Sequence, residues 1–258
     1  MSLTFQSGSK LSPICKIIGG KYNGKTVSLN KKLDEITADE FKKLKIPNNS
    51  VFQMLPDKTL ERQLIYITGA SGSGKSTFTR KYVKEYKKAY KDREVYLFSA
   101  LTEDESLDEV KPKRFMMDER MVSEPIRAED LKDSLCLFDD IDVLPNKKIK
   151  EAVYQILNEI LQIGRHHRIS CITTNHLPTN FQWTRIILNE SHIVVYFPAA
   201  ATNKVKYMLQ TYVDLEPEQI KYFKKCGSRW IAVFRHFPQL FLAEHEVGLL
   251  NQDTDDEN

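Results

Sequence analysis

The chain has 258 residues, of which 41% are hydrophobic and 28% charged, and this composition suits one soluble α/β domain with small additions. No apolar run approaches the roughly 18 residues that a membrane-spanning helix needs, and the first residues lack the pattern of a signal peptide. We therefore expect an intracellular protein without a membrane partner. The net charge of +3 includes an acidic cluster in the last six residues, so the rest of the chain is moderately basic and permits a polyanionic partner.

Residues 1–60 are expected to form an N-terminal tail and a β-hairpin region. Two strand-like runs, Ile14–Ile18 and Lys25–Leu29, flank the turn dipeptide Asn23-Gly24. The lysine-rich segment that follows predicts a short helix near Ala38–Leu44.

Residues 61–200 alternate between short apolar runs and stretches with helical spacing. The apolar runs predict strands at 63–68, 95–98, 135–138, 169–174 and 193–197. The helical spacing predicts helices at 75–90 and 147–163. Near-continuous apolar strands separated by helices imply an α/β fold with a mostly parallel sheet covered by helices on both faces.

Residues 201–258 form the third predicted region. Helices are expected at 203–212 and 217–225, followed by a hairpin of 230–234 and 240–243 that we expect to extend the edge of the sheet. An acidic tail ends the chain.

The segment between the first core strand and the first core helix matches the pattern G-x-x-x-x-G-K-[ST]. Its glycines allow backbone N–H groups to surround phosphate oxygens, Lys75 can reach the β- and γ-phosphates, and the Ser76 hydroxyl can bind magnesium. Strand, loop and helix together predict a P-loop NTPase that binds ATP and Mg²⁺. The expected nucleotide-binding residues are Gly69, Ala70, Ser71, Gly72, Ser73, Gly74, Lys75, Ser76 and Thr77.

Two acidic residues follow a later apolar strand, as a hydrolytic site requires. Asp139 is expected to hold magnesium, and Asp140 is placed to polarise the attacking water. The alternative is that both residues cap a helix or form a turn after the strand.

Two further residues are candidates for sensing or stabilising the phosphates. Asn175 ends the next strand and can touch the γ-phosphate or orient the water, unless it caps the turn before Pro178. Arg165 lies in a linker expected at the opposite edge of the sheet, too far for its own nucleotide, where it can act on a neighbouring subunit. Arg168 is a second choice, and an exposed basic loop is the alternative.

Together, these motifs resemble the FtsK/HerA superfamily of DNA-pumping ATPases, most closely the poxvirus-type genome-packaging ATPases of large DNA viruses and virophages. The resemblance covers roughly residues 60–200 and rests on the phosphate loop, residues 133–140, Gly164-Arg165-His166 and Thr174-Asn175. The common motor pattern has Glu where this chain has Asp140, which leaves the identity of the base open.

The resemblance also implies partners and a location. Members form rings, which implies a homo-oligomer (a pentamer or a hexamer) that drives double-stranded DNA into a preformed capsid and docks on a capsid or portal component. The implied location is the host cytoplasm or a viral factory, with possible association with the virion. The implied roles are Mg-ATP binding by Lys75, Ser76 and Asp139, water activation by Asp140 and a trans-acting Arg165.

Two other classes share the glycine loop. A P-loop kinase or phosphotransferase uses an arginine-rich lid, for which Arg114, Arg120 and Arg127 are the candidates, although acidic neighbours surround them. A GTPase needs the guanine-reading pattern N-K-x-D, which Asn146-Lys147-Lys148 begins and Ile149 fails to complete.

Overall fold

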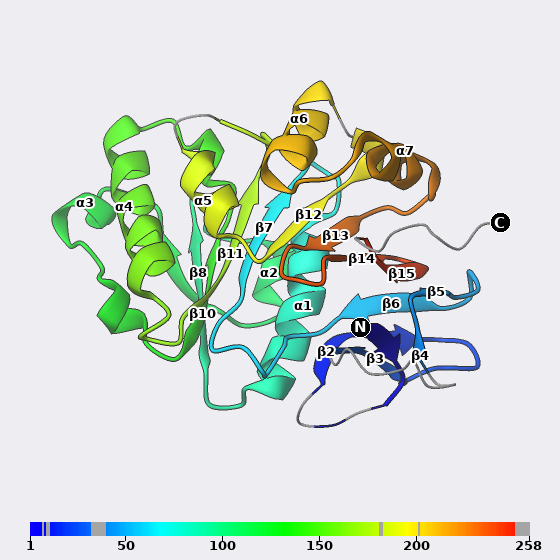
Figure 1. Ribbon diagram of the computed structural model, residues 1–258. Coiled ribbons are helices and arrows are strands. Elements are labelled where there is room, and N and C mark those ends of the chain that lie inside the picture. Colours follow the sequence, from blue (N-terminus) through cyan, green and yellow to red (C-terminus); the bar gives the residue numbers. More distant parts are fainter. Residues whose placement is uncertain (7, 9–10, 32–39, 181–182, 201, 251–258) are drawn as a thin grey trace.

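The computed structural model describes residues 1–250 except 7, 9–10, 32–39, 181–182 and 201, and its described strands form two sheets (Figure 1). The acidic tail at 251–258 lies outside the described residues. The larger sheet has ten strands and is mixed, and the smaller has five strands and is antiparallel.

Six neighbouring strands of the large sheet run parallel and carry the apolar runs of residues 61–200. In spatial order they are β12 (Ile193–Tyr196), β7 (Leu64–Thr68), β11 (Ser170–Asn175), β10 (Ser134–Phe138), β8 (Glu94–Ser99) and β9 (Lys113–Met116). The expected parallel core is therefore present.

Antiparallel strands extend this sheet beyond β12. They are β13 (Ile231–Phe234), β14 (Leu240–Ala243), β15 (Glu246–Leu249) and β5 (Lys43–Lys45). The expected C-terminal hairpin corresponds to β13 and β14, and it does extend the edge of the sheet. The last strand, β5, comes from the N-terminal region, so the two ends of the chain share one sheet edge.

Helices cover both faces of the parallel strands, because successive side chains of each strand point to opposite sides. On β7, Ile65 and Ile67 pack in one core with Phe78 of α1 (Lys75–Ala89), whereas Leu64 and Tyr66 pack in the other core. The second core includes α4 (Lys147–Ile163), α5 (Thr184–Glu190), α6 (Asn203–Tyr212) and α7 (Pro217–Lys225).

Shorter helices connect these elements. They are α2 (Glu105–Asp108), α3 (Arg120–Ser123) and the 3₁₀ turns η1 (Ala128–Leu131), η2 (Ile141–Val143) and η3 (Pro198–Ala200). Within the described part of the chain, no helix is both long and apolar enough to cross a membrane.

The five-stranded N-terminal sheet packs on the same side of the large sheet as α1 (Figure 1). Its order is β4 (Glu40–Phe41), β1 (Ser2–Thr4), β3 (Thr26–Asn30), β2 (Ser12–Ile18) and β6 (Val51–Met54). The expected hairpin is confirmed as β2 and β3, but it forms part of a larger sheet because β1, β4 and β6 were too short to recognise from the sequence.

The helix expected near Ala38–Leu44 is wrong over residues 40–44, and residues 38–39 lie outside the described part. β4 and β5 occupy this segment instead, each paired with a strand remote in sequence, β1 and β15. Such remote pairing overrides local propensity. The division into 1–60, 61–200 and 201–258 stays a prediction.

Candidate nucleotide site

The glycine loop joins β7 to α1 at the carboxyl edge of the parallel strands. Gly72 and Gly74 have φ angles of 74° and 112°, in the region that favours glycine. Gly74 also precedes the first turn of α1 without any side-chain cap. The backbone N–H groups of this helix end therefore remain available to an anion.

Lys75 begins α1 and folds back over the loop. Its Nζ donates a hydrogen bond to the carbonyl oxygen of Gly69 at 3.0 Å and lies 3.4 Å from Oδ1 of Asp140. The side chain is only 6% exposed, so a buried ammonium group faces the end of the loop. This geometry places one positive charge where phosphates would lie.

Asp139 and Asp140 meet Thr174 because β10 and β11 are parallel neighbours that pair Phe138 with Thr173. The Thr174 hydroxyl lies 2.9 Å from Oδ1 of Asp139 and 3.2 Å from Oδ1 of Asp140, and it accepts the Asp140 N–H at 2.9 Å. Burial, and secondly the charge of Asp140, raise the pKa of Asp139 to about 6. One hydroxyl thus positions both carboxylates.

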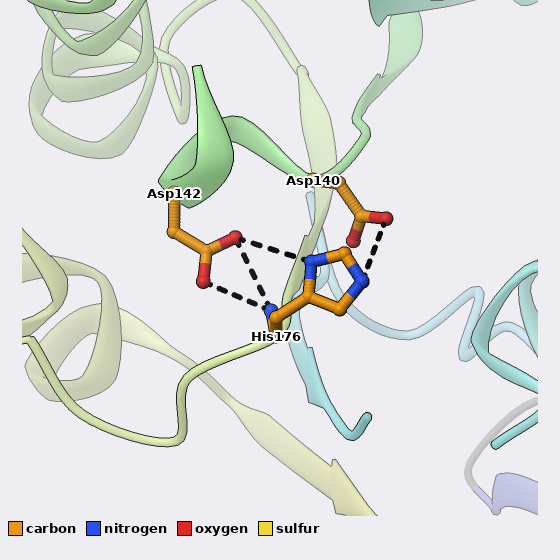
Figure 2. Close-up of side chains that lie close together, drawn as sticks. All are labelled: Asp140, Asp142 and His176. Atoms are coloured by element: carbon orange, nitrogen blue, oxygen red, sulfur yellow. Dashed lines mark hydrogen bonds and ion pairs between the residues drawn. The ribbon is translucent and has the colours of Figure 1, made fainter. Parts of the chain in front are cut away.

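Asp140 has a left-handed backbone, with a φ of 48°, which is uncommon outside glycine but tolerated by Asp. Figure 2 shows its carboxylate beside the imidazole of His176, with Nε2 3.4 Å from Oδ2. Asp142 accepts the backbone N–H of His176 and orients the turn that carries this imidazole. His176 and Asp142 were not among the residues singled out from the sequence.

The residues at this edge fit a magnesium ion. Asp139 and Asp140 supply carboxylate oxygens and Ser76 supplies a hydroxyl, which are the hard oxygen ligands that Mg²⁺ prefers. Burial and the neighbouring carboxylate of Asp140 raise the pKa of Asp139, and a bound cation would favour its charged form.

Asn175 lies one residue beyond Thr174 and therefore on the other side of the sheet. Its side chain is fully buried near the hydroxyl groups of Tyr66 and Tyr154. Its contact with the γ-phosphate stays a prediction. Thr173, Thr174 and Asn175 are all buried, but the strand period of two places Thr174 on the opposite side of the sheet from the other two.

Arg165 lies in the turn between α4 and β11, before the amino end of the strand, whereas the glycine loop follows the carboxyl end of β7. Its side chain is 70% exposed and pairs with Glu61. Arg168 makes two hydrogen bonds to Asp133, at 2.5 and 2.7 Å. Both arginines lie at the opposite edge of the sheet from their own loop, as the topology predicts.

Two residues from later parts of the chain also contact the loop. Arg229 donates from Nε to the Ser73 carbonyl oxygen at 3.3 Å. The ring of Phe197 lies only 2.8 Å from where a Cβ at Gly69 would be, and 3.4 Å from where one at Gly74 would be. No local motif marks either residue, since only the pairing of β12 and β13 beside β7 brings them there.

No protein-family model matches the chain. Protein V3 of the Sputnik virophage, described as uncharacterized, is 37% identical over 244 residues, which cover 92% of this chain and 95% of V3. The genome-packaging NTPase B204 of Sulfolobus turreted icosahedral virus 2, in complex with ATP-gammaS, is 14% identical with a TM-score of 0.46, over 72% of this chain and 97% of B204. The pCW3 conjugation coupling protein TcpA is 12% identical with a TM-score of 0.46, over 95% of this chain and 79% of TcpA. The relative V3 comes from a virophage, which agrees with the virophage part of the resemblance drawn from the sequence.

Proposed function

The chain belongs to the family of the Sputnik virophage protein V3, and on that premise we propose that it is an ATP-driven translocase that packages double-stranded DNA into a viral capsid. The observation that carries the ATPase part is the meeting of Lys75, Asp139, Asp140 and Thr174 at the end of the glycine loop. The DNA-packaging part rests on the sequence resemblance.

Each residue then has a chemical role. Lys75 exchanges its contacts with Gly69 and Asp140 for the β- and γ-phosphates, while the loop N–H groups hold the other phosphate oxygens. Asp140, freed from Lys75, accepts a hydrogen bond from the attacking water. Ser76 and Asp139 would hold Mg²⁺, which supplies charge neutralisation at the phosphates when bound.

The exposure of Arg165 supports a site shared between ring subunits. Its guanidinium group cannot serve the loop of its own chain from the opposite sheet edge, but it is free to approach the loop of a neighbour once it leaves Glu61. Such a ring would grip the phosphate backbone of DNA without reading bases and would dock on a capsid or portal component.

The kinase alternative gains no support from its three lid candidates. Arg114 pairs with Asp108, Arg120 with Asp118 and Arg127 with Glu159. Each of these guanidinium groups is therefore already paired with a carboxylate outside the glycine loop.

The test is the rate of ATP hydrolysis with and without double-stranded DNA. We expect DNA to stimulate the rate severalfold, and Lys75→Ala to lower it at least about 100-fold, because the variant lacks the buried cation. Lys84→Ala is the matched control, since Lys84 lies on the same helix and pairs with Glu109 at an exposed position.

Two results would contradict this assignment. Normal turnover by Lys75→Ala would remove the site from the glycine loop. Stimulation by a nucleoside or another small acceptor, and not by DNA, would favour the phosphotransferase.

A further inference from the structure

The N-terminal sheet and the C-terminal strands enclose a cavity beside the glycine loop that the phosphate chemistry does not use. One wall is β6, and the opposite wall is Phe197 together with Arg229 and Trp230. The two walls are joined, because Phe52 donates its N–H to the Glu244 carbonyl oxygen at 2.8 Å. The cavity therefore depends on both ends of the chain.

The floor of this cavity is one face of α1. It contains Gly74, Thr77, Phe78 and Lys81, whose spacing of three and four residues places them on the same side of a helix. The γ-phosphate end of the site is marked by Lys75 and Asp140. A phosphate chain that runs along the loop from that end leaves its other end, the nucleoside, on the side where Thr77 and the cavity lie.

The walls suit a flat heteroaromatic ring. Trp230 packs edge-on against Phe78, with ring centroids 4.9 Å apart, and also lines the cavity. Arg229 also lines the cavity, and its guanidinium group lies beside Gly74. Indole and guanidinium planes both stack on nucleobases.

Polar side chains on the walls favour a base with an exocyclic amino group. Gln53 uses its amide nitrogen on the Met54 carbonyl, which leaves its amide oxygen as an acceptor. Glu244 supplies a carboxylate, of which Oε2 already accepts the Arg229 N–H at 2.7 Å. The cavity holds about 70 Å³, less than a purine, so the exposed Arg229 has to move aside as the base enters.

We propose that the adenine of bound ATP occupies this cavity, stacked on Trp230, between the N-terminal sheet and the C-terminal strands. The proposal rests on the proposed function, because it needs a triphosphate on the glycine loop. In this arrangement β6 and the C-terminal strands both contact the nucleoside, so that a bound nucleotide links β6 to the ATPase core.

The chain contains two tryptophans, which permits a direct optical test. Trp183 stacks on Tyr154, on the side of the sheet covered by α4, and Trp183→Phe leaves Trp230 as the sole indole. We expect ATP to change the fluorescence of this variant saturably, whereas inorganic tripolyphosphate, which lacks a base, leaves it unchanged. In Trp230→Phe, where only Trp183 remains, neither ligand should change the emission.

Affinity measurements separate the base pocket from the phosphate loop. Trp230→Leu should raise the Kd for ATP about tenfold, which corresponds to about 1.4 kcal/mol, and leave the Kd for tripolyphosphate unchanged. Trp230→Phe keeps an aromatic face and should retain most of the affinity. A purely structural role of Trp230 would weaken both ligands together.

The possible failures are distinguishable. If the wild type binds tripolyphosphate as tightly as ATP, and Trp230→Leu changes neither, the phosphate site stands and the base pocket is overturned. If the wild type binds neither ligand, the proposed function fails and the base pocket fails with it.

Discussion

The hydroxyl of Thr174 lies between two carboxylates that have different expected tasks. It approaches Asp139, the proposed magnesium ligand, and also accepts the backbone N–H of Asp140. Hydrogen bonds to charged groups contribute about 1.5–3 kcal/mol each. A residue that holds both carboxylates should therefore act on turnover more than on nucleotide binding.

We expect Thr174→Val to lower kcat about 10- to 100-fold with little change in KM, because the bonds lost position the water-activating carboxylate. Thr174→Ser keeps the hydroxyl and should stay within a few-fold of the wild type. Steady-state ATPase kinetics provide the measurement. Equal losses in Thr174→Val and Thr174→Ser would show that the methyl group, and not the hydroxyl, matters.

His192 is a buried titratable residue remote from the nucleotide site. Burial, and secondly the charge of His236, lower the pKa of His192 from 6.5 to about 4. Its Nδ1 accepts the N–H of Leu64 at 3.3 Å, and protonation of that nitrogen would remove the acceptor. Between about pH 6.5 and pH 4 the unfolded chain therefore binds a proton that the folded chain excludes.

This difference makes His192 a source of acid sensitivity. The free energy of unfolding should decrease as the pH falls through this window, with a slope of at most about 1.4 kcal/mol per pH unit from this group. His192→Asn should flatten the slope in urea unfolding between pH 7 and pH 4, whereas His166→Asn, at an exposed position, should not. An unchanged slope in His192→Asn would assign the acid sensitivity to other groups.

Among the secondary-structure elements, three long helices were predicted with their bounds. Helices α4, α6 and α7 have the bounds expected from the spacing of their apolar residues. Periodicity and caps are local signals, which explains this agreement. Strands β4 and β5 were missed because each is stabilised by a partner remote in sequence.

Asn146, which starts the incomplete guanine-reading motif of the sequence, directly precedes helix α4. Asn146 accepts the N–H groups of Lys148 and Ile149 at 3.0 and 3.3 Å, which makes it an N-cap. Asn146→Ala should lower the free energy of unfolding by about 1 kcal/mol, and Asn146→Asp, which caps equally well, by much less. Urea unfolding with ATPase assays would check this, and loss of nucleotide binding in Asn146→Asp would contradict a purely capping role.

At the scale of the whole molecule, Arg165 and the glycine loop lie at opposite edges of the same sheet. If Arg165 acts on a neighbouring subunit, Arg165→Ala should bind ATP normally but lose at least about 100-fold in turnover, as trans-acting arginines do in related chemistry. Arg168→Ala is the comparison from the same turn: Arg168 is the second candidate, but two bonds to Asp133 hold it, so we expect that variant to keep its turnover.

Mixed oligomers test the geometry directly. Arg165→Ala subunits retain Asp140, and Asp140→Asn subunits retain Arg165, so an interface between the two variants can contain one intact site. Mixing the two inactive variants should restore part of the ATPase activity. Absence of recovery at every mixing ratio would count against action in trans.

The sequence by itself determined the phosphate loop, the parallel core and the order of the acidic residues Asp139 and Asp140, because these depend on contiguous motifs and on local periodicity. The tertiary structure alone decided that Thr174 contacts the carboxylates while Asn175 faces the opposite side, and that Arg229 reaches the loop. It also brought β6 and Trp230 together beside α1. These placements follow from sheet register and from pairing between remote strands, and a local sequence pattern carries neither.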